Sequence, residues 1–120
     1  MILLYVLFIH WVADFVFQHE QWALNKSKYI DSLIMHTSMY GFILYLAFIP
    51  ILGFISALYF AGINYLLHTI VDYFSSKVVA KRFESKYLGG PIPNFGAFTV
   101  IGFDQFLHYC SLFLTLKLFL

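Results

Sequence analysis

Residues 8–18 read FIHWVADFVFQ, and this stretch shows a feature that recurs through the chain: ionisable side chains inside an apolar run. His10 and Asp14 lie four residues apart, which is about one helical turn. Both side chains therefore fall on one face of a helix, and Gln18 follows one turn later. Burying an ionisable group in a bilayer costs about 2.5–3.5 kcal/mol on insertion scales, so these residues indicate a functional site.

The composition predicts an all-α, polytopic membrane protein. The 120 residues are 62% hydrophobic and only 11% charged, with a mean hydropathy of +0.82. Soluble domains are nearer one quarter charged, and a soluble protein of this size could not bury so much apolar surface. A net charge of +1 without a basic patch argues against a nucleic-acid partner. The single cysteine, Cys110, excludes an intrachain disulfide and is expected to serve packing.

The hydropathy pattern predicts a four-transmembrane-helix bundle in a single domain over residues 1–120. The expected spans are about 2–18, 33–49, 54–74 and 96–119, joined on one side by polar connections at 19–32 and 75–95. Spans of roughly this length cross a hydrocarbon core of about 30 Å. The N-terminal run lacks a basic region and a small-residue cleavage site, so we expect a retained span and not a signal peptide.

Charge sets the expected orientation. The two connections hold six of the seven Lys and Arg residues, and Lys117 is the other. The positive-inside rule then places both connections in the cytosol and both termini on the extracytoplasmic side. We therefore expect a multi-pass protein of the inner (cytoplasmic) membrane, with the lipid bilayer as its first partner.

The pair in the opening stretch has counterparts in the later spans. His68 precedes Asp72 by four residues, and Asp104 precedes His108 by the same spacing. The second span adds His36 near its start. With the expected spans, all of these groups fall in the cytosolic half of the bundle. The candidate ligands are His10, Asp14, His36, His68, Asp72, Asp104 and His108.

Four imidazoles and three carboxylates form a ligand set for divalent metal, with Zn, Mn or Fe as candidates. The number of groups suits two ions with bridging carboxylates, or one ion with a hydrogen-bonded outer shell. Asp14, Asp72 and Asp104 are also the candidate catalytic carboxylates, one of them as general base. Outer-shell or substrate-binding roles are expected from Gln18, Gln105, Lys26 and Lys77.

Other functions use the same residues. A divalent-metal or proton carrier or channel would employ the cluster as a relay, although the outer half of the spans offers few polar groups. A small membrane effector would employ it as a purely structural polar network, which predicts no bound metal. Haem is disfavoured because carboxylates are not usual axial ligands.

The motifs resemble a known family. HxxxDFxxQ at residues 10–18, HxxxD at 68–72 and DQxxH at 104–108 are similar to the bacterial and phage membrane family catalogued as domain of unknown function 3307. A looser likeness links the HxxxD pairs to membrane-bound metal-dependent hydrolases. That likeness implies hydrolysis of a phosphoester. The depth of the site suggests a lipid head group or a small cytosolic phosphate compound as the substrate. The sequence leaves homo-oligomer formation open.

Overall fold

The computed structural model describes residues 1–89 and 95–120, and every regular element among them is a helix. The prediction of an all-α protein is confirmed. Residues 90–94, part of the expected second connection, lie outside the described residues. In chain order the elements are α1 (Ile2–Trp11), the π-helical turn η1 (Val12–Val16), α2 (Glu20–Asn25), α3 (Ile30–Leu52), α4 (Phe54–Glu84) and α5 (Ala97–Phe119).

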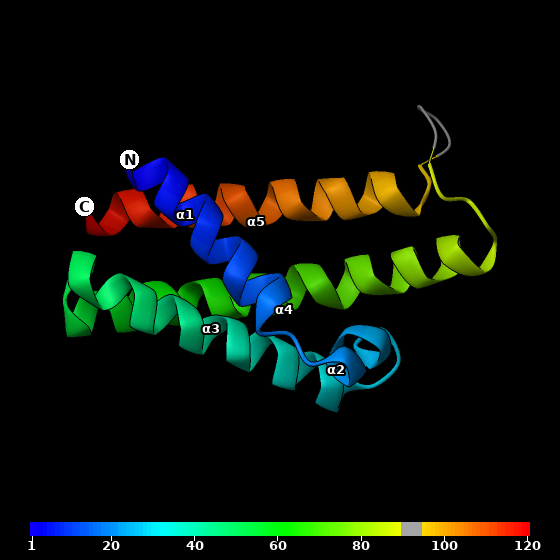
Figure 1. The fold of residues 1–120 in the computed structure, drawn as a ribbon, viewed down its shortest axis with the longest axis horizontal. Helices are drawn as coiled ribbons and strands as arrows, with labels where there is room; N and C mark the ends of the chain where they lie inside the picture. Colours follow the sequence, from blue (N-terminus) through cyan, green and yellow to red (C-terminus); the bar gives the residue numbers. More distant parts are fainter. Residues whose placement is uncertain (90–94) are drawn as a thin grey trace.

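Three long helices form the body of the protein, with α4 packed against both α3 and α5 (Figure 1). The single residue Gly53 joins α3 to α4, with φ of 82°, a conformation that glycine adopts without a Cβ penalty. Its N–H donates to the carbonyl of Ile49 at 2.8 Å and so closes the end of α3. Helix α1 runs diagonally across the long helices, and both termini lie at the same end of the molecule (Figure 1).

The long helices α3, α4 and α5 are each apolar and long enough to cross a membrane. The first apolar segment, Ile2–Val16, is shorter. At 1.5 Å per residue it covers about 22 Å of a core that is about 30 Å thick. The protein therefore has three candidate spans where the sequence predicts four. The fourth crossing and the orientation of the termini remain predictions.

Helix bounds extend beyond the expected spans and into both connections. Helix α3 covers residues 30–52 against an expected 33–49, and α4 continues to Glu84, ten residues past the expected end at 74. The first connection contains α2. The extension of α4 supplies one wall of a cavity beside the site.

The interior changes from apolar to polar along the bundle. On α4 the buried residues begin with Ala57, Phe60 and Ala61 and end with His68, Asp72 and Ser76. The antiparallel α3 and α5 show the reverse order, so the apolar parts pack together in the half nearer the termini. Large apolar side chains also cover much of the outer surface, as expected for helices that face lipid. The polar cluster is thus enclosed in the other half.

Candidate metal centre

All seven histidines and aspartates singled out by the sequence are buried, each with at most 9% of its surface exposed. The structure brings them together at the polar end of the interior. Their i, i+4 spacing on the long helices puts each pair on the inward face. The members are His10 on α1, Asp14 on η1, His36 on α3, His68 and Asp72 on α4, and Asp104 and His108 on α5.

A π-helical turn positions Asp14. The N–H of Phe17 donates to the carbonyl of Val12, five residues earlier, at 3.1 Å. This widened turn leaves both Ala13 and Asp14 buried at the end of the first apolar segment. Isolated π turns within helices are frequent at functional sites. The local backbone therefore directs the first carboxylate into the bundle.

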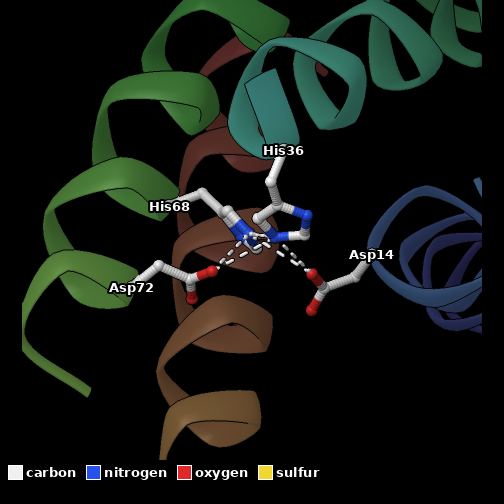
Figure 2. A group of neighbouring side chains, drawn as sticks. All are labelled: Asp14, His36, His68 and Asp72. Carbon is white, nitrogen blue, oxygen red and sulfur yellow. Dashed lines mark hydrogen bonds and ion pairs between the residues drawn. The ribbon is translucent and has the colours of Figure 1, made fainter. Parts of the chain in front are cut away.

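Asp14, His36, His68 and Asp72 form a first group, and Figure 2 shows the two imidazoles between the two carboxylates. The His36 Nε2 atom lies 3.1 Å from Asp14 Oδ1 and 3.1 Å from Asp72 Oδ2. The His68 Nε2 atom lies 3.4 Å from each of the same oxygens. The two Nε2 atoms are 3.2 Å apart. Each residue thus offers one donor atom toward a common centre.

The five separations just given, 3.1–3.4 Å, are compatible with a divalent ion. A tetrahedral ion with bonds of about 2.0–2.1 Å holds its ligand atoms about 3.3–3.4 Å apart. A proton on one Nε2 can point at only one of the three close neighbours. The Nδ1 atoms of His36 and His68 have no hydrogen-bond partner within the described residues, whether or not their Nε2 atoms bind an ion.

Asp72, Asp104 and His108 form a second group that shares Asp72 with the first. The His108 Nε2 atom lies 3.1 Å from Asp72 Oδ1 and 3.0 Å from Asp104 Oδ2. The two oxygens of Asp72 thus face different groups, Oδ2 the first and Oδ1 the second. Ser75, one turn beyond Asp72, donates its hydroxyl to Asp104 Oδ1 at 2.5 Å. The second group thus offers three donor atoms that could bind a metal ion, and the first group offers four.

His10 lies beside both groups but is held by other partners. Its Nδ1 is 3.0 Å from the Tyr40 hydroxyl, and its Nε2 is 2.7 Å from Gln105 Oε1. The Gln105 amide donates to Asp104 Oδ2 at 3.0 Å and to Asp14 Oδ2 at 3.3 Å. Gln105 therefore links a carboxylate of each group to His10. This geometry suits His10 as support for the carboxylates, in contrast to the ligand role that the sequence suggests.

Tyr40 and Ser75 were not expected at the site from the sequence. The Tyr40 ring stacks on His68, with ring centroids 3.9 Å apart and planes 16° apart. Tyr40 lies one turn after His36, and Ser75 lies about one turn after Asp72. Their spacing from the charged residues is the signal that could have identified them.

Of the two expected lysines, one reaches the carboxylates. The Lys26 ammonium donates to Asp72 Oδ2 at 3.0 Å. Burial lowers the pKa of Lys26, but the charges of Asp72 and Asp14 outweigh burial, so its pKa is raised and it stays positively charged. Lys77 instead donates to the Ser27 carbonyl at 3.0 Å and lies over the Tyr73 ring at 4.6 Å. Lys77 thus fixes the loop that carries Lys26.

A cavity of about 330 Å³ adjoins the two groups. Helices α2, α4 and α5, the turn η1 and the loop after α2 surround it. Its polar lining includes Asp14, Gln18, Lys26, Ser76, Asp104 and Gln105. The rest of its wall is mainly apolar. Gln18, the remaining sequence candidate, lines this cavity together with Asp14 and Asp104.

These features define an all-α protein with three candidate membrane-spanning helices and a buried His/Asp cluster that could hold metal ions. The chain belongs to the family described as "Protein of unknown function (DUF3307)", whose model matches residues 2–120. The resemblance to this family is thus confirmed, whereas the looser likeness to hydrolases remains a prediction; the family description states no activity. Comparison with curated proteins and with solved structures gives no match.

Proposed function

We propose that the protein is a membrane-embedded, metal-dependent hydrolase with two divalent ions, and that it cleaves a phosphoester. The observation that carries this proposal is the Asp72 carboxylate, which faces one group through Oδ2 and the other through Oδ1. A carboxylate between two ligand groups is the arrangement expected of a bridged two-ion site. Bound ions would supply an activated water and stabilise charge on the phosphoryl oxygens.

The two groups suit different roles. Four donors complete a tetrahedral ion, whereas three donors leave a position free for water or substrate, as in catalytic zinc sites. Asp104 of the three-donor group also borders the cavity. We place the reaction at this group, on the side where a substrate can enter.

Charge favours an anionic substrate. Three carboxylates face one ammonium, from Lys26, and imidazole binds metal in its neutral form. One divalent ion offsets the excess negative charge, and a second makes the site positive. A positive cavity attracts a phosphate group. If one aspartate acts as general base in place of a ligand, Asp14 and Asp104 are the better-placed candidates because they border the cavity.

The carrier or channel alternative lacks a comparable observation. On the far side of the cluster the interior is closed by apolar side chains, including Leu44, Phe48, Phe60 and Leu112. The buried Asn64 amide and Thr115 hydroxyl in that half bond to each other at 2.9 Å. A polar path through one chain would have to cross this packed region, whereas a one-sided active site does not.

The test is hydrolysis of a generic water-soluble ester, bis(p-nitrophenyl) phosphate, by metal-loaded protein in detergent. Asp104→Asn should abolish turnover because it removes a donor beside the cavity. Asp31→Asn, the same change at an exposed residue of α3, should leave turnover unchanged. Metal-loaded protein with no activity on phosphomonoesters or phosphodiesters would contradict the proposal.

A further inference from the structure

The lining of the cavity beside the two candidate metal-binding groups changes from polar to apolar along its length. After Asp72, successive turns of α4 place Ser76, then Val79, then Phe83 along one wall. On the antiparallel α5, Ile101 lies one turn before Gln105 and lines the opposite side. The lining is therefore polar next to the metal groups and apolar farther along the same two helices.

The polar part contains buried atoms that lack partners. Ser76 is 8% exposed, and its hydroxyl has no hydrogen-bond partner within the described part of the chain. The buried Oε1 atom of Gln18 is also unpartnered among these residues. Both side chains line the cavity. Buried polar atoms without partners cost free energy; a ligand oxygen would accept from the Ser76 hydroxyl, and a ligand hydroxyl would donate to Gln18 Oε1.

The apolar part continues to the surface. Leu24 of α2 is 68% exposed, and Phe15 and Phe83 are each 46% exposed, although all three line the cavity. A ligand that was polar throughout would leave this wall against water or against its own polar groups. A ligand with an apolar portion would cover the wall and gain the free energy of apolar burial.

We infer that this cavity binds an amphiphilic phosphate compound, with its phosphate beside Lys26, Ser76 and the metal groups and its apolar portion between Val79, Phe83 and Leu24. This inference rests on the proposed function for the phosphate, and it adds the substrate class. A membrane lipid and a water-soluble alkyl phosphate share this chemistry. Glycerol phosphate and inorganic phosphate do not.

Binding of two non-hydrolysable probes tests the inference without requiring turnover. Hexylphosphonate and methylphosphonate carry the same head group and differ only in their apolar part. We expect purified protein of measured metal content to bind hexylphosphonate at least about tenfold more tightly by titration calorimetry, because several methylene groups become buried. Competition by dioleoyl phosphatidic acid would assign the site to a lipid, and lack of competition to a water-soluble amphiphile.

Adjacent valines of α4 provide the matched control. Val79 lines the cavity, whereas Val78 is 41% exposed and does not. Val79→Trp should remove the preference for hexylphosphonate and keep the metal content, and Val78→Trp should keep both. Partitioning of the probe into detergent affects both variants equally. Equal binding of the two probes, or a preference unchanged in Val79→Trp, would overturn the inference.

The outcome is separable from that of the proposed function. Tight hexylphosphonate binding without hydrolysis of any ester would support the amphiphile-binding site and contradict the proposed hydrolase function. Hydrolysis of bis(p-nitrophenyl) phosphate without tighter binding of hexylphosphonate than of methylphosphonate would support the hydrolase function and contradict an amphiphilic substrate.

Discussion

The Nε2 atoms of His36 and His68 lie 3.2 Å apart in the interior, and each is within 3.4 Å of a carboxylate oxygen from Asp14 and one from Asp72. A bound cation would account for this convergence of nitrogen and oxygen atoms. The four residues come from three separate elements, η1, α3 and α4. Any ion held there would therefore tie these elements together.

Removal of metal should destabilise the fold. Without ions, the charge of the three buried carboxylates is offset only by Lys26 and by protons on the neighbouring imidazoles, and the link that an ion makes between the helices is lost. A ligand present at about 1,000 times its Kd stabilises the native state by about 4 kcal/mol, so we expect excess chelator to lower Tm by at least about 5 °C. Thermal unfolding in detergent measures this shift. A Tm that does not change when chelator is added would indicate a purely structural polar network without bound metal.

The second group should be separable from the first. His108→Ala removes one of three donors from the second group and none from the first. We expect metal content to fall by about one ion per chain and hydrolysis to fall by more than the ~10–100-fold typical of supporting residues. His19→Ala, at an exposed histidine, is the control. Full activity of His108→Ala with one ion per chain would show that the four-donor group acts alone.

Gln105 should act through the carboxylates that it holds. Gln105→Met removes an amide that bonds Asp14 and Asp104 while keeping the approximate side-chain size. We expect a ~10–100-fold loss of metal affinity in a folded protein. Competition with a chromogenic chelator measures the affinity, and Gln21→Met at an exposed residue of α2 is the matched control. Equal affinities in the two variants would exclude a supporting role for Gln105.

The first apolar segment should cross the membrane despite its length. In a Cys110→Ser background, we expect Lys28→Cys to react with an impermeant maleimide only from the cytosolic side. Ile2→Cys and Lys117→Cys should react only from the outside, because the basic connections favour the cytosol. Labelling of Ile2→Cys and Lys28→Cys from the same side would leave three crossings and place the two termini on opposite sides.

The four-residue spacing of histidines and aspartates explains why the clustered residues could be identified from the sequence. His68 and Asp72, like Asp104 and His108, share a helix face at four residues apart, and a charged face in an apolar helix must turn inward. Packing of α4 against α3 and α5 then brings these faces together. The all-α class follows from the same apolar runs.

Other parts of the site depend on contacts that no local pattern encodes. Lys26 bonds Asp72 across 46 residues, and His10 reaches Gln105 across 95. A π-helical turn buries Asp14, and the cavity depends on the helical extension of α4 to Glu84. Spacing alone therefore could not separate His10 from the candidate ligands or show the apolar wall beside them.

The most direct test is the metal content of purified protein by elemental analysis, with Asp72→Asn and Asp31→Asn beside the wild type. Because Asp72 contributes to both groups, we expect about two ions per chain in the wild type and in Asp31→Asn, and less than one in Asp72→Asn. Folded wild-type protein that takes up no divalent transition metal, or Asp72→Asn with an undiminished content, would contradict the account.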